Sequence, residues 1–349
     1  MAPPALPTAL GRRLPEFAAM LLSDREPAAE VRLVVLPKQP RKNPIFARSD
    51  IDVARNLLQL AIASRRRAEA WPEVCRAMAR SDIAASKDGD RSIAERIARA
   101  TGVADGAAKA IAESARAMRH ESSLQVLRGL LPGGWHPKVI LKGRSHLDAV
   151  LARGKGAILW MAHFVFAGSV VKMAIHEARY PLAHFSRPEH AFSKTRFGIA
   201  MLNPIRVSFE NRYLSRRLIY RREQPAAAMQ AMREFLAQNG VVTMTAGAWE
   251  GSRFIEAPFL DAIIRLAAGP VRVARESSAG LLPVFGVQTG SDEFLVRIGE
   301  PMELSPDTGA DETARGAGRQ LLTALAPVVL KYPAQWRGWS SLIDPPQPA

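Results

Sequence analysis

The sequence holds a single cysteine, Cys75, in 349 residues. One thiol cannot form an internal disulfide and cannot supply the paired thiolates of a zinc knuckle, so neither crosslink organises this chain, and a reducing compartment suits it. Aromatic residues make up only 7% of the chain, whereas hydrophobic residues reach 48% and charged residues 23%. These values are typical of a globular protein and exclude a disordered, collagen-like or coiled-coil chain.

Acidic residues are also in short supply. The chain has 33 Asp and Glu residues against 48 Lys and Arg residues, which gives a net charge of +15 at pH 7. Such an excess predicts a negatively charged partner, which could be nucleic acid, an anionic membrane surface, or an acidic or phosphorylated substrate. The charge by itself leaves all three open.

Long hydrophobic runs are absent from the sequence. Residues 1–20 contain four prolines and two arginines, which is unlike a secretory signal peptide. The most apolar window, residues 156–175, is interrupted by His163 and Lys172, so it predicts a buried strand followed by a buried helix rather than a membrane span. We therefore expect a protein that is not exported and that meets membranes only peripherally.

The pattern of the chain changes near residue 135. Apolar residues recur at helical spacing between residues 50 and 128, and short apolar runs then alternate with amphipathic stretches. This predicts an α/β fold with a central mixed sheet wrapped by helices and a helical N-terminal lead-in. The expected divisions are a helical region at 1–135, an α/β domain at 136–344 and a frayed tail at 345–349.

Individual elements follow from the same patterns and from turn residues. The predicted strands are 156–162, 181–185, 205–209, 240–245, 281–287 and 294–298. The predicted helices of the second region are 146–153, 211–222, 225–238 and 313–331.

His163 comes directly after the predicted strand 156–162. Open α/β sheets bind ligands at the carboxyl ends of their strands, so a titratable side chain at this place is positioned for catalysis. A buried histidine that is satisfied by a backbone carbonyl is the alternative.

Five short blocks occur in one order around this histidine: GKGAILWMAHF (154–164), FSRPEH (185–190), APFL (257–260), SAGLLPVF (278–285) and YPAQW (332–336). Together, over about residues 146–339, they resemble the lauroyl/myristoyl (lipid A biosynthesis) acyltransferase family, which is related to the glycerophosphate acyltransferases. The resemblance implies a glycerophosphate-acyltransferase-like fold, in which acyl chain and acceptor meet at the strand ends.

The resemblance also implies a catalytic base. The family's motif is His, four residues, then Asp or Glu; the histidine accepts the acceptor's proton and the acid orients the imidazole. Here the motif is HFVFAG, so His163 is present and Gly168 replaces the acid. Glu250, in the stretch 246–251, is the candidate substitute, and its alternative is an ordinary solvated loop glutamate.

Further site residues are implied by the other blocks. Arg187 matches an arginine that holds a phosphate or a phosphopantetheine, with Arg196 extending the basic wall; a helix-capping or surface role for Arg187 is equally open. Arg253 and Asp261 flank the APFL block and are expected to contact the head group.

The segment 211–222 contains five arginines and no acid, interleaved with apolar residues. On a helix this composition predicts contact with an anionic membrane or an acidic carrier protein through Arg216, Arg217, Arg221 and Arg222. A solvated helix face is the plain alternative. Nucleic-acid binding is disfavoured because no zinc spacing, zipper heptads or RNA-binding aromatics accompany the arginines.

The resemblance, the charge and the motifs lead to one expectation. The chain is predicted to be an acyltransferase that moves a fatty acyl group from acyl-carrier protein or acyl-CoA to a lipid or glycolipid, at the cytoplasmic side of the inner membrane. No metal or cofactor is expected. The alternative is a catalytically inactive relative that binds a lipid or an acyl-carrier protein, and a basic nucleic-acid-binding protein ranks third.

Overall fold

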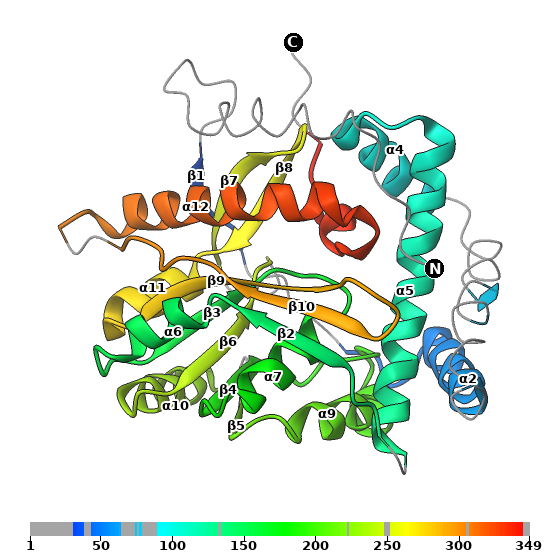
Figure 1. The fold of residues 1–349 in the computed structure, drawn as a ribbon, viewed down its shortest axis with the longest axis horizontal. Coiled ribbons are helices and arrows are strands. Elements are labelled where there is room, and N and C mark those ends of the chain that lie inside the picture. Colours follow the sequence, from blue (N-terminus) through cyan, green and yellow to red (C-terminus); the bar gives the residue numbers. More distant parts are fainter. Residues whose placement is uncertain are drawn as a thin grey trace.

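A computed structural model describes residues 31–37, 43–63, 74, 77–78, 89–131, 134–221, 223–247, 252–304 and 307–344. Within them, the chain forms a seven-stranded sheet in the order β2-β10-β9-β3-β6-β4-β5, with helices on both faces (Figure 1). The predicted α/β class with a central mixed sheet is confirmed. No helix in this part of the chain combines the length and the apolarity that crossing a membrane needs.

The strands of the large sheet are mostly parallel. Strands β3, β4, β5, β6 and β9 run in one direction, whereas β10 pairs antiparallel with β9 and parallel with β2. Their bounds are β2 Lys138–Lys142, β3 Ala157–Met161, β4 Leu182–Ser186, β5 Arg216–Ile219, β6 Val241–Thr245, β9 Gly280–Gln288 and β10 Glu293–Ile298.

Helices cover this sheet from both sides. The crossover from β3 to β4 and the crossover from β5 back to β6 move in opposite directions, so their helices α7 and α10 lie on opposite faces. The helices are α6 Arg144–Leu151, α7 Ala167–Glu177, α8 Arg196–Met201, α9 Asn203–Asn211, α10 Pro225–Ala237, α11 Gly269–Ser277 and α12 Ala310–Lys331.

A second, three-stranded antiparallel sheet consists of β1 Arg32–Val35, β7 Arg253–Phe259 and β8 Ala262–Ala267. Helix α12 packs against β7 and β1. The N-terminal region also supplies α2 Arg48–Ala63, α4 Gly89–Thr101 and the long α5 Asp105–Leu130, which stands beside the large sheet (Figure 1). The predicted helical lead-in is therefore present in the described residues, together with one strand, β1.

Two predicted elements are wrong. Residues 205–209 alternate apolar and polar side chains like a strand, but Pro204 lies in the first turn of α9 and the segment is helical. Residues 211–222 were expected to form a helix, yet Arg216–Ile219 is the edge strand β5, with Leu218 as its one buried side chain. With one buried side chain in four residues, this edge strand has only a weak hydrophobic pattern.

The carboxyl ends of β3, β4, β6 and β9 meet at one edge of the sheet. The C-terminal segment closes this edge: Val165 N donates to Gln335 O at 2.8 Å, and Arg337 N donates to His163 O at 2.9 Å. The Gln335 side chain also exchanges two hydrogen bonds with the backbone of Gln288 at the end of β9. The first and last of the five sequence blocks are thus in contact.

Candidate functional site

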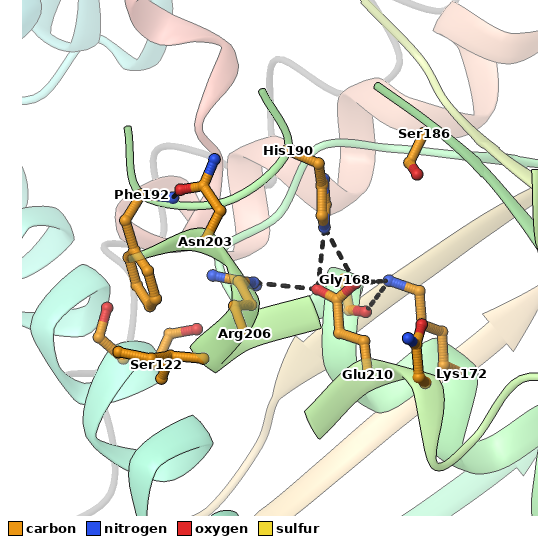
Figure 2. A network of polar contacts seen from close by, with 12 residues as sticks. Ser122, Gly168, Lys172, Ser186, His190, Phe192, Asn203, Arg206 and Glu210 are labelled. Carbon is orange, nitrogen blue, oxygen red and sulfur yellow. Dashed lines mark hydrogen bonds and ion pairs between the residues drawn. The ribbon is translucent and has the colours of Figure 1, made fainter. Parts of the chain in front are cut away.

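A buried carboxylate is the centre of the polar network at this edge. Glu210, on α9, has a fully buried side chain and forms ion pairs with Lys172 at 2.9 Å, Arg206 at 3.0 Å and Arg217 at 2.9 Å. Its two carboxylate oxygens also lie 3.1 and 2.9 Å from Nε2 of His190. Figure 2 shows His190, Arg206 and Lys172 pointing at this one carboxylate.

Four elements place these side chains. Arg206 and Glu210 are four residues apart on α9 and so share one helix face. Lys172 extends from α7 and also donates to the Gly168 carbonyl at 2.6 Å. Arg217 comes from β5, and His190 comes from the loop that follows β4. The fold therefore assembles a charge cluster from segments that are up to 45 residues apart (172–217).

The carboxylate of Glu210 is ionised. Burial alone would raise its pKa, but His190, Lys172 and Arg206 hold that pKa well below its usual range. Burial lowers the pKa of Lys172 to about 8, although Glu210 opposes the change. Three cationic side chains thus surround one negative charge, and the cluster has an excess of positive charge.

His190 is held as a neutral imidazole. Burial lowers its pKa, Lys172 and Arg206 add to this, and Glu210 opposes it. Because a carboxylate only accepts hydrogen bonds, Nε2 carries the proton and Nδ1 keeps its lone pair. The side chain remains 27% exposed. A histidine oriented by a buried carboxylate has the arrangement of a general base.

His163 lies at the carboxyl end of β3, as the sequence predicts, two residues after the last strand residue Met161, and is half-buried. Burial and then the guanidinium groups of Arg337 and Arg206 lower its pKa well below the ordinary value. A Cβ placed on Gly168 would lie 3.3 Å from Nη2 of Arg206 and 4.0 Å from Oε1 of Glu210. The carboxylate of Glu210 is thus beside the place from which the missing acid would extend.

The same cluster contains the donor atoms of a possible metal site. In the described part of the chain, His184, His190 and Glu210 offer ligand atoms within 4.8 Å of one another. His184 already hydrogen-bonds Thr243 Oγ1 through Nδ1 at 2.9 Å. A divalent cation would also have to displace the cations that pair with Glu210, so the donor set favours proton transfer over metal binding.

Arg187 and Arg196 lie in the same segment as His190, between β4 and α9. Arg187 follows β4 directly, is half-buried, and its carbonyl accepts a hydrogen bond from His190 N at 3.0 Å. Arg196 is exposed at the first position of α8, where its backbone N–H donates to Pro44 O. Arg187 is thus joined to the His190 loop through its backbone, and the side chain of Arg196 is exposed on α8.

Arg253 and Asp261 belong to the second sheet. Arg253 is exposed at the start of β7, and its guanidinium lies 3.5 Å from Asp311. Asp261 is exposed in the turn between β7 and β8 and has a φ of 59°, a left-handed conformation that Asp tolerates. The structure gives Asp261 a turn role and does not bring it into contact with the cluster around Glu210.

The predicted membrane-contact arginines separate in the structure. Arg216 and Arg221 are exposed, as that prediction requires. Arg217 contradicts it, because its side chain is only 9% exposed and is paired with Glu210. Arg222 and Glu250 lie outside the described residues, so the acid proposed from the sequence is not placed here.

A cavity of about 620 Å³ lies between the second sheet and the helices α10, α11 and α12. Apolar residues make up much of its wall, including Leu33, Met229, Val271 and Ala314. Its charged lining residues are Arg253, Arg272, Arg275, Glu276 and Asp311. This is the volume range of small-molecule sites, and the predicted contact residue Arg253 lines it.

Sequence reasoning assigned no catalytic or binding role to His190, Lys172, Arg206 or Glu210. One signal was available: a lysine within the most apolar window of the chain requires a buried partner. Nothing in the sequence identifies that partner, because Glu210 directly follows residues 205–209, whose alternation predicts a strand.

Comparison of the sequence with models of known protein families finds no match, and comparison with curated proteins finds none either.

Proposed function

We propose that this chain is an acyltransferase with a glycerophosphate-acyltransferase-like fold, which moves a fatty acyl group from a thioester donor to a lipid or glycolipid at the cytoplasmic face of a membrane. The observation that carries the proposal is the His190–Glu210 pair at the carboxyl edge of the parallel strands. A partly exposed neutral imidazole, oriented by a buried carboxylate, supplies the general base that acyl transfer to a hydroxyl needs.

In this proposal the acceptor hydroxyl donates its proton to Nδ1 of His190 while its oxygen attacks the thioester carbonyl carbon. The carbon–sulfur bond then breaks, and the imidazolium returns the proton to the departing thiolate. Glu210 fixes the tautomer through Nε2 and stabilises the imidazolium between the two steps. His163, the base expected from the sequence, is the alternative proton acceptor at the same edge.

The positive charge around the site supports a phosphorylated donor or acceptor. Burial lowers the pKa of Arg337 to about 10, and the nearby guanidinium groups of Arg206 and Arg119 contribute to this change. A phosphate in this region would offset the repulsion among these cations and would suit paired hydrogen bonds from guanidinium groups. Acyl-CoA and acyl-carrier protein both carry such phosphates, as do lipid head groups.

The competing function is an inactive relative that binds a lipid or an acyl-carrier protein. Gly168 favours it, since His163 has no acid at the family's spacing. The three ion pairs of Glu210 also favour an inactive relative, because these cations weaken the stabilisation that Glu210 gives to an imidazolium.

One experiment separates the two functions. The purified protein is incubated with acyl-CoA or acyl-carrier protein and a lipid extract, while thiol release is followed and the lipids are analysed by mass spectrometry. An acyltransferase releases thiol and increases the mass of one lipid class by one acyl chain. Donor binding without thiol release or a mass change would instead establish the binding protein.

A further inference from the structure

Helix α2 has two apolar faces, and among the described residues only one of them is buried. Leu57 and Leu60 are buried, and the helix contacts α5. Ile51, Leu58 and Ile62 are 56%, 63% and 57% exposed. These three residues are seven and then four positions apart, so they form one stripe along the outward face of the helix.

A second group of exposed apolar side chains adjoins the start of α2. Ile45 and Phe46 precede the helix, and Phe197 and Met201 are on α8. The rings of Phe46 and Phe197 are 5.3 Å apart, and Phe197 N donates to Ile45 O at 2.9 Å. The two segments are therefore fixed to each other.

A buried carboxylate makes this junction firm. Asp50, in the first turn of α2, accepts hydrogen bonds from Ser193 Oγ at 2.6 Å and Thr195 Oγ1 at 2.9 Å. Thr195 in turn caps α8 by accepting a hydrogen bond from Gly198 N. Helices α2 and α8 consequently present their exposed side chains from a rigid base.

We name the seven exposed apolar residues Ile45, Phe46, Ile51, Leu58, Ile62, Phe197 and Met201 the α2–α8 surface. They are seven of the eleven large apolar side chains exposed in the described part of the chain. Scattered exposed apolar residues are normal, whereas their concentration on two joined segments is typical of an interaction surface.

Charge identifies the kind of partner. Within residues 43–63 and 192–201, the exposed basic residues are Arg48, Arg55, Lys194 and Arg196. The acids of these segments are Asp52, which pairs with Arg55 at 3.3 Å, and the buried Asp50. Apolar side chains accompanied by an excess of cations fit the head-group region of an anionic bilayer.

We infer that the α2–α8 surface docks on an anionic lipid bilayer, with α2 lying along the membrane plane. The segment 211–222 is less suited to this task, because Arg217 is paired with the buried Glu210. Helix α8 follows the His190 loop in the sequence and packs against α9, the helix that carries Glu210. The inference relies on the proposed function only for the lipid's role as a substrate.

The test is sedimentation of the full chain with phosphatidylcholine vesicles prepared with and without phosphatidylglycerol. We expect binding to the anionic vesicles, weakened by salt. The double variant Leu58→Ser and Ile62→Ser should lower the partition coefficient at least about tenfold, since two apolar side chains no longer enter the lipid. The matched control is Val35→Ser with Ile140→Ser, which removes exposed apolar residues outside the surface and should bind like the wild type.

Two results would overturn the inference. One is that the wild type, the double variant and the control all bind the vesicles equally well, or that none of them binds. The other is that the wild type is a dimer, the double variant is a monomer, and neither binds lipid. The surface would then join two copies of the chain. Thiol release from a soluble acyl-CoA, measured without vesicles, tests the proposed function separately.

Discussion

Two histidines occupy the same edge of the sheet and differ in what holds them. His163 is the base that the family resemblance predicts, but Gly168 stands at the position where that family has an acid. His190 lacks any such spacing, yet a carboxylate from another helix lies 2.9 Å from its Nε2. The difference shows that the acid that orients a histidine can come from a distant part of the sequence and need not belong to a short motif around that histidine.

The surroundings of the two histidines differ as well. The charged neighbours that act on His163 are mainly Arg337 and Arg206, which disfavour its imidazolium. His190 faces the same Arg206, but Glu210 opposes that effect. An imidazolium formed in the proposed reaction is therefore stabilised better at His190 than at His163, and mutations can test this comparison.

The largest effect should follow from removing His190. We expect His190→Ala to lower kcat/KM about a hundred- to ten-thousand-fold, the usual contribution of a general base. His163→Ala should cost about tenfold or less. Both would be measured by thiol release from acyl-CoA, with thermal unfolding as the control for folding. If His163→Ala proves the more damaging variant, the base is the one indicated by the sequence motif.

Removing Glu210 should destabilise the fold, in addition to the activity lost when His190 no longer has its orienting acid. Glu210→Gln leaves the fully buried Lys172 without its counter-charge, and losing one partner of a buried pair costs about 3–5 kcal/mol. Adding Lys172→Met should recover part of that loss, because the unpaired charge is removed as well. Urea unfolding of the two variants measures both values. An unchanged midpoint for Glu210→Gln would mean that the cluster does not stabilise the fold.

The sequence was sufficient for the fold class and for the elements with strong periodicity. Strands β3, β4, β6, β9 and β10 and helices α6, α10 and α12 lie where their apolar patterns predict them. The errors fall on α9 and β5, which have few buried residues each. Because these two elements carry Arg206, Glu210 and Arg217, the same errors hid the cluster.

The position of His163 could be predicted because it depends on one strand and the turn after it. The pairing of His190 with Glu210 depends on how the His190 loop and α9 pack together, which a single sequence does not encode locally. Lys172 illustrates the intermediate case: its burial follows from its apolar neighbours, but its partner does not.

The histidines should also make stability depend on pH. Burial is the leading cause that lowers the pKa of His163, His184 and His190 below the ordinary value of 6.5. The unfolded chain then binds protons that the folded chain does not, so stability is greatest above pH 6.5 and falls as the pH drops below it. Each histidine contributes up to about 1.4 kcal/mol per pH unit.

Urea unfolding between pH 7 and pH 5 measures this dependence. His184→Gln should reduce the slope, since its amide replaces the bond to Thr243 without titrating. His176→Gln, which changes an exposed histidine in the same way, is the control. If His184→Gln leaves the change of stability with pH unaltered, this histidine does not contribute to the pH dependence of stability.

The smallest effect, and the most direct comparison of the two histidines, comes from moving the carboxylate. Gly168 does not have a positive φ, and an added Cβ would press only on the tip of the flexible Arg206 side chain, at 3.3 Å. Gly168→Glu together with Glu210→Gln keeps one acid in the cluster but attaches it at the family's spacing from His163. We expect the turnover of this double variant to stay within about tenfold of the wild type, because one oriented histidine replaces another. Adding His163→Ala should now abolish activity, while adding His190→Ala should have little effect. If His190→Ala remains the costly substitution after the acid has moved, Glu210 was not what made His190 the base.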